Sequence, residues 1–101
     1  MKLMNPVPEK ILWLVSRGEI EFSGKGYQQL FAGPYNRSDV QNAIMFGRVI
    51  KKERDETRVA KYKYTIIGPS LGGEELYCCG KIRKMRSGEE YFIITFHGAE
   101  L

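Results

Sequence analysis

Alternating apolar and polar residues in the C-terminal half of the chain predict three consecutive β-strands between residues 58 and 98. Successive side chains of a strand point to opposite faces, so the apolar residues of each strand should share one face. The residues expected to point inward are Ala60, Tyr62, Tyr64, Ile66, Leu76, Cys78, Gly80, Ile82, Phe92, Ile94 and Phe96. Three strands that agree on an apolar face indicate an antiparallel sheet covered on one side by helices.

The N-terminal half of the chain predicts the helices that would cover this sheet. Apolar residues at helical spacing favour a helix over residues 8–17, which should end at Gly18. A short strand over residues 19–23 and a short helix over residues 27–31 are expected next.

A second covering helix is expected after residue 37. Ser38 is the predicted N-cap, Gln41 completes a capping box three residues later, and Gly47 ends the helix. Residues 48–54 begin apolar and become charged, which is typical of a strand near a sheet edge, where lysines discourage unwanted pairing. The fold class predicted from these elements is α+β.

Positive charge collects on the outward faces of the three C-terminal strands. The outward residues concerned are Lys61, Lys63, Lys81, Arg83 and His97. If the strands pair side by side, these groups form one cationic platform that carries the chain's single histidine. Such a platform suits RNA, although an uncovered sheet face must in any case show polar residues to water.

The composition fits one domain over residues 1–101. The chain is 43% hydrophobic and 28% charged, and 16 basic against 12 acidic residues give a net charge of +4, which is compatible with a nucleic-acid partner without requiring one. Cys78 and Cys79 are neighbours, so no disulfide framework is expected and a cytoplasmic location is predicted. No metal, cofactor or membrane span is expected, since ligand clusters, phosphate-loop spacing and long apolar runs are missing from the sequence.

Four segments carry a family resemblance: they read IEFSGKGYQQL, RSDVQNAIMFGRVI, YKYTIIGPSLGGEELYCC and EEYFIITF, and lie within residues 19–97. Together they resemble a family of small bacterial and archaeal RelE-like proteins. The resemblance implies the barnase, EndoU, colicin and RelE fold class, with the helix over residues 8–17 as an addition to its core. Some relatives are encoded beside YgiT-type zinc-finger antitoxins, which implies a toxin-type ribonuclease and an antitoxin partner.

One position departs from the family pattern. Family members place a histidine and an alanine after the strand that ends in Phe-Ser, whereas this chain has Lys25 and Gly26. Lysine can contact a phosphate but is a poorer proton shuttle near neutral pH. The flanking glycines either let a phosphate approach the backbone or simply permit a tight turn.

Metal-free RNA cleavage requires a base, an acid and a cation that stabilises the crowded phosphate. His97 is the candidate base or acid, Lys81 and Arg83 the candidate phosphate-stabilising groups, and Tyr91 a candidate for base stacking or proton donation. The expected phosphate-binding residues are Lys25, Lys61, Lys63, Lys81 and Arg83.

The leading hypothesis is a RelE-like toxin that binds mRNA, free or on the ribosome, and cleaves it as an endoribonuclease. The alternative is a non-catalytic module of the same fold that binds RNA or a protein. A homodimer formed through an exposed strand edge or through the helix that carries Trp13 is compatible with either hypothesis.

Overall fold

The computed structural model describes residues 5–56 and 62–99, and within these ranges a single mixed sheet organises the chain. Its strands are β1 (Asn5–Pro6), β2 (Ile20–Phe22), β3 (Arg48–Arg54), β4 (Tyr62–Pro69), β5 (Glu75–Met85) and β6 (Gly88–Gly98). The order across the sheet is β1-β3-β4-β5-β6-β2. All neighbours are antiparallel except β2 and β6, which run parallel.

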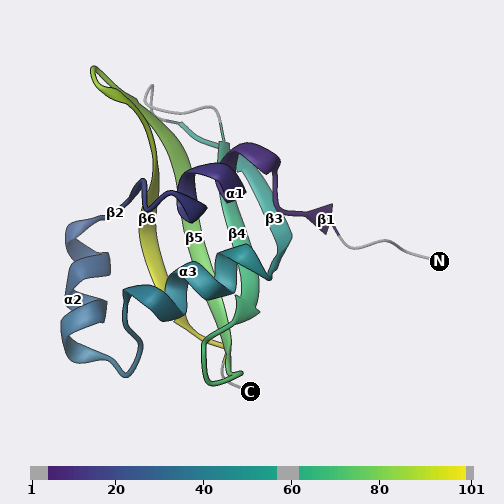
Figure 1. Cartoon of the computed structure of the whole chain (residues 1–101), viewed down its shortest axis with the longest axis vertical. Helices are drawn as coiled ribbons and strands as arrows, with labels where there is room; N and C mark the ends of the chain where they lie inside the picture. The colour runs from purple at the N-terminus through teal and green to yellow at the C-terminus, as the bar shows by residue number, and fades with distance from the viewer. Residues whose placement is uncertain (1–4, 57–61, 100–101) are drawn as a thin grey trace.

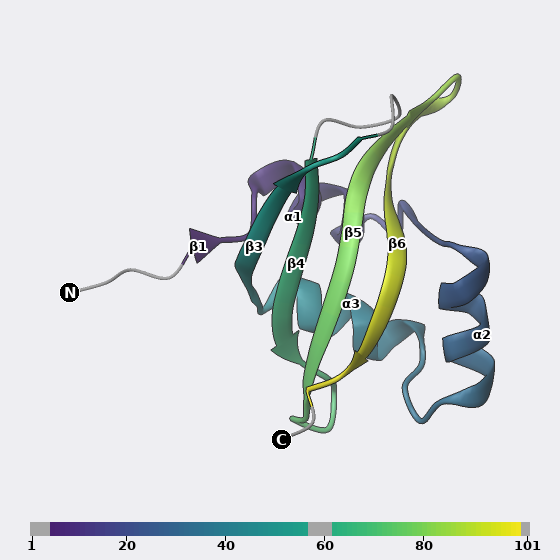
Figure 2. The ribbon, with the colours of Figure 1, turned by 180° about the vertical axis from the view of Figure 1, so that it is seen from behind.

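The helices are α1 (Glu9–Ser16), α2 (Gly24–Ala32) and α3 (Arg37–Met45). Figure 1 shows α1 and α3 lying across one face of the sheet, while α2 stands at the β2 end. Seen from behind in Figure 2, no helix crosses β3, β4, β5 or β6. The α+β prediction, with helices on one face of a mainly antiparallel sheet, is confirmed.

The hydrophobic core lies between the two covering helices and the sheet. Its fully buried side chains are Ile11, Leu14, Val15, Val40, Ile44, Ile66, Leu76, Cys78, Tyr91 and Ile93. The predicted inward faces of β4 and β5 are confirmed, since Tyr64 and Ile82 pack against this cluster beside the buried strand residues. Ala60 lies outside the described residues.

The start of α3 differs from the sequence-based prediction. Asn36, not Ser38, is the N-cap, and its side chain accepts a hydrogen bond from the Asp39 N–H while the Asp39 carboxylate accepts one from the Asn36 N–H. Asparagine and aspartate at this spacing satisfy the free N–H groups of the first turn as well as a Ser–Gln pair does. Gln41 instead donates to the Val15 carbonyl, which ties α3 to α1.

The predicted inward and outward faces of β6 are wrong over half of the strand. Cys79 pairs with Thr95, but Gly80 pairs with Ile93, so Ile94 is an unpaired bulge residue. One extra residue reverses the side-chain alternation beyond it. Tyr91 and Ile93 are therefore buried in the core, whereas Phe92 and Ile94, predicted to be core residues, lie half-buried on the outward side.

Candidate nucleic-acid interface

The uncovered face of the sheet is built from residues that the strand register places side by side. One row across the sheet runs Ile67–Tyr77–His97, and the next runs Thr65–Cys79–Thr95. Lys81 and Phe92 form a third paired position further along β5 and β6. We call these three rows the open face.

His97 stands at one end of the open face. Its imidazole is exposed and lies edge-on to the Tyr77 ring, with 5.4 Å between ring centroids and 84° between ring planes. Its Nδ1 lies 3.0 Å from the Gly98 carbonyl oxygen. The two rings offer a ligand an apolar surface, and the Tyr77 hydroxyl and the His97 ring nitrogens offer it polar groups.

Lys81 lies on the predicted face but is already engaged. Its ammonium forms an ion pair of 3.1 Å with Asp55, and the two side chains are only 11% and 4% exposed. A buried lysine in a paired geometry serves the fold, because removing one partner leaves the other charge buried and unpaired. A role in stabilising a phosphate would require Lys81 to exchange Asp55 for RNA.

Arg83 is held in a similar way. Its Nε donates to a Glu90 carboxylate oxygen at 2.8 Å, its Nη2 donates to the same oxygen, and the guanidinium lies 3.8 Å from the Phe92 ring centroid. A guanidinium bound to a carboxylate and stacked on an aromatic ring is fixed in orientation. Sequence reasoning missed Glu90, although the two-residue turn between β5 and β6 places it directly opposite Arg83.

Tyr91 is not on the open face. Its ring is fully buried among core side chains, and a Cβ added to Gly80 would lie 2.8 Å from it. Burial raises the pKa of the Tyr91 hydroxyl well above its usual value, because the phenolate would be desolvated. The hydroxyl has no hydrogen-bond partner among the described residues, and its position gives it no route to a phosphate on the sheet.

The remaining predicted phosphate ligands are scattered. Lys63 follows the open-face alternation of β4 and is half-buried, with no ion-pair partner in the part of the chain that the structure describes. Lys61 lies outside the described residues. Lys25 is exposed in the first turn of α2, which begins at Gly24, so the predicted Gly-Lys-Gly loop is helical.

The predicted catalytic residues do not converge on one atom. His97 is opposite Tyr77, and Lys81 is four residues further along β5. A strand rises about 3.3 Å per residue, so roughly 13 Å separates these positions along the sheet. The Lys81 ammonium is held by Asp55 rather than directed toward His97, and Tyr91 faces the other way.

A hollow lies away from the open face, between α1 and the turn that joins β5 to β6. It encloses about 350 Å³ and is lined by Trp13, Leu14, Arg17, Glu19, Met85, Ser87, Gly88 and Glu89. Trp13 is 56% exposed, and the Arg17 guanidinium lies 4.6 Å from its ring centroid. The two lining carboxylates make this hollow a poor phosphate site.

The described residues form neither a metal site nor a membrane-spanning helix. They contain no group of three His, Cys, Asp or Glu side chains that could hold a metal ion. None of the described helices is long and apolar enough to cross a membrane. No known protein family matches the chain, and no curated protein or solved structure is significantly similar to it.

The two cysteines should differ sharply in reactivity. Burial raises the pKa of the Cys78 thiol to about 12, whereas Cys79 is half-exposed on the open face. Because the thiolate is the reactive form, we expect a disulfide-exchange reagent to modify Cys79 alone in the folded protein. Mass mapping of peptides checks this, and a Cys79→Ser variant should react only after denaturation. Comparable labelling of Cys78 in the native state would contradict the core described above.

Proposed function

We propose that the protein binds single-stranded RNA on the open face and holds it without cleaving it. The observation that supports this best is the contact between the half-buried Tyr77 ring and the exposed His97 ring at one end of the open face. Proteins that bind single strands on a sheet stack bases on aromatic rings and hold the backbone with cations at the margin.

Charge around this pair suits the backbone of a bound strand. Lys63 on β4 and Arg48 on β3 follow the outward alternation, and neither has an ion-pair partner in the described ranges. Ile67 lies between Arg48 and the aromatic pair, and Thr65 lies between Lys63 and Ile67 along β4, where its hydroxyl can reach sugar or base edges. Lys81 and Arg83 are paired with Asp55 and Glu90, so their positive charges are neutralised and they contribute mainly to the shape of the surface.

Replacement of Tyr77 tests this proposal. A stacked base contributes about 1–3 kcal/mol, so Tyr77→Ala should raise the Kd for a labelled oligouridylate of about ten nucleotides roughly tenfold. Tyr77→Phe should bind as the wild type does, because the ring is retained. Fluorescence anisotropy at two salt concentrations measures both affinity and the phosphate contribution.

The matched control for this measurement is Trp13→Ala. Trp13 is an exposed aromatic residue on the helix-covered side of the molecule, so its removal should leave the affinity for RNA unchanged. Equal affinities for Tyr77→Ala and Trp13→Ala would contradict binding on the open face. Lys63→Gln should lower the salt dependence of binding, because one phosphate contact is lost.

A toxin-type ribonuclease of the RelE kind, with an antitoxin as its partner, is the second candidate. It is favoured by one specific observation, that His97 is exposed beside Tyr77 and would lie next to bound RNA. Expression from a tight promoter separates the candidates: growth arrest and mRNA cleavage, both relieved by His97→Ala, would replace the binding proposal with the enzymatic one. We expect neither arrest nor cleavage, since the other predicted catalytic groups are paired or buried.

A further inference from the structure

The hollow between α1 and the β5–β6 turn is held on two sides. On one side, the Tyr91 N–H donates to the Glu19 carbonyl at 2.9 Å, and the Glu19 N–H donates to the Leu14 carbonyl at 2.9 Å. On the other side, Lys10 of α1 forms an ion pair of 3.0 Å with Glu89 of β6. These contacts join the helix to the hairpin around a space of about 350 Å³, which is large enough for a small ligand.

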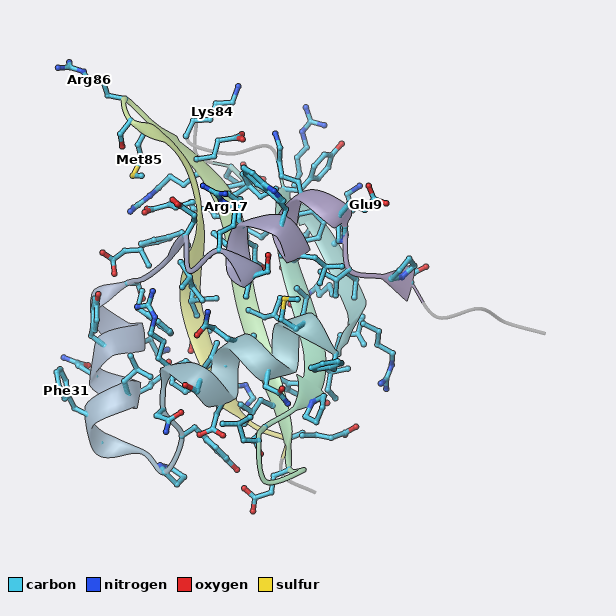
Figure 3. The ribbon with its side chains drawn as sticks, in the orientation of Figure 1. Glu9, Arg17, Phe31, Lys84, Met85 and Arg86 are labelled. Atoms are coloured by element: carbon cyan, nitrogen blue, oxygen red, sulfur yellow. The ribbon has the colours of Figure 1, made fainter. Side chains whose placement is uncertain are left out.

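One wall of the hollow is an accessible indole ring. Trp13 is 56% exposed even though the Arg17 guanidinium lies 4.6 Å from its ring centroid. A cation at this position covers one part of the ring and leaves the rest open to a ligand. Met85 lines the hollow from the hairpin, and Figure 3 shows it above Arg17. An indole and a thioether both pack well against a flat aromatic ring.

The charges around the hollow are already balanced. Glu89 is paired with Lys10 at 3.0 Å, and Arg17 Nη2 lies 3.9 Å from Glu19 Oε2. A cationic ligand would therefore have to displace a lysine or an arginine, and an anionic ligand would meet two carboxylates. Hydrogen-bonding capacity remains, because a carboxylate has about four acceptor positions and a contact of 3.9 Å is longer than a hydrogen bond. The Glu19 carboxylate can thus accept hydrogen bonds from a neutral ligand.

We propose that this hollow binds a neutral, planar heterocycle whose edge carries two adjacent N–H donors, which is the chemistry of a guanine base. The ring stacks on Trp13, and the two donors bind the two oxygens of the Glu19 carboxylate. The Watson–Crick edge of guanine has two neighbouring donors, whereas adenine, cytosine and uracil place an acceptor beside their donor, which a carboxylate repels. A site that hydrogen-bonds both donors rejects analogues that lack one of them.

This site is separate from the open face. Met85 and the hollow lie at the end of β5, whereas Tyr77 and its partner His97 lie near the start of that strand. Oligouridylate has no edge with two adjacent donors, so it tests the open face without occupying the hollow. The guanine proposal and the RNA proposal can therefore fail independently.

Trp13 is the only tryptophan of the chain, so its fluorescence reports on the hollow directly. Titration of the full chain with GMP should quench this fluorescence to saturation. AMP should bind at least about tenfold more weakly, because its edge turns an acceptor toward the carboxylate. Glu19→Gln should weaken GMP binding about tenfold, since an amide accepts fewer hydrogen bonds and carries no charge.

The matched control is Glu75→Gln, which makes the same change at an exposed residue at the other end of β5. This variant should bind GMP as the wild type does. Linear quenching that is equal for GMP and AMP would show collisions alone and overturn the proposal. Equal affinities of Glu19→Gln and Glu75→Gln would also overturn it, because the carboxylate would then have no part in recognition.

Methyl NMR of the methionines locates the bound ligand. The Met85 methyl signal should shift on addition of GMP, because an aromatic ring then lies beside it, whereas Met45, which packs against the core from α3, should not move. Trp13→Ala should lose GMP binding in equilibrium dialysis, a measurement that does not need the fluorophore. A shift at Met45 without one at Met85, or full binding by Trp13→Ala, would place the ligand elsewhere and overturn the proposal.

Two further ligands complete the test. If the hollow is a cation site, arginine amide quenches Trp13 at lower concentration than GMP and binds Lys10→Met better than the wild type, which would overturn the proposal. A uridylate chain with one terminal guanosine identifies the source of the base. A Kd below that of GMP indicates an RNA end, a Kd at or above it indicates a free nucleotide, and both results support the site. Tyr77→Ala should leave GMP binding unchanged, so failure of the RNA proposal leaves this one intact.

Discussion

Gly68→Ala is expected to lower the free energy of unfolding by about 3 kcal/mol or more, because overpacking against backbone cannot be relieved by a side-chain rotation. A Cβ at Gly68 would stand 1.9 Å from the Ala43 carbonyl oxygen and 2.8 Å from the Gly47 Cα. The C-terminal end of α3 crosses β4 at this point, and the helix sits directly on the strand because both residues are glycines. The variant must move α3 away from the sheet.

Chemical denaturation measures this change, and Gly72→Ala is the matched control. Gly72 lies in the turn after β4, where a Cβ would meet only the Ser70 hydroxyl at 3.9 Å. Its replacement should alter the free energy of unfolding by less than about 0.5 kcal/mol. Equal effects of the two substitutions would mean that α3 does not make the close approach to β4.

Local sequence signals decided which parts of the fold could be predicted. Residues 48–54 were predicted as a strand and form β3 with the same bounds, because the apolar start and charged end are local signals. Helix α1 and the β5–β6 hairpin were predictable for the same reason. The predicted strand that begins at residue 58 is confirmed only from Tyr62, where the described part of β4 starts.

The facing of β6 could not be predicted from its own residues. Residues 91–94 are all apolar or aromatic, so either phase of the alternation gives an apolar face. The choice is made by contacts from a distant segment. The Ser23 N–H donates to the Ile93 carbonyl at 2.9 Å and the Ser23 hydroxyl donates to the Ile94 carbonyl at 2.6 Å, which fixes the bulge.

In the candidate site too, local pairings could be predicted from the sequence and long-range pairings could not. The strand register that places Arg83 opposite Glu90 follows from the short turn between β5 and β6 and could have been used. The pairing of Lys81 with Asp55 joins positions 26 residues apart and depends on where Asp55, directly after β3, lies relative to β5. A lysine on an outward face therefore looked available in the sequence when it is in fact buried and paired.

Lys81→Met is expected to lower the free energy of unfolding by about 3 kcal/mol, since it leaves the Asp55 carboxylate buried without this cation. The double variant Lys81→Met/Asp55→Leu should recover most of that loss, because well-packed apolar residues often replace a buried ion pair at little cost. Lys10→Met is the control at the more exposed Lys10–Glu89 pair and should cost only about 1 kcal/mol. Urea denaturation of all three variants provides the measurement.

The double variant Lys81→Met/Asp55→Leu also distinguishes a structural role of Lys81 from a phosphate-binding role. If Lys81 holds the fold, the single variant binds RNA poorly only in proportion to its unfolded fraction, and the double variant binds as the wild type does. If Lys81 contacts a phosphate, the double variant regains stability yet still binds weakly and with a shallower salt dependence. We expect the first result, because the ammonium is 3.1 Å from Asp55 and both side chains are almost fully buried. A loss of RNA binding in the stable double variant would return Lys81 to the binding surface, and the open face would then extend from the Tyr77–His97 pair to the far end of β5.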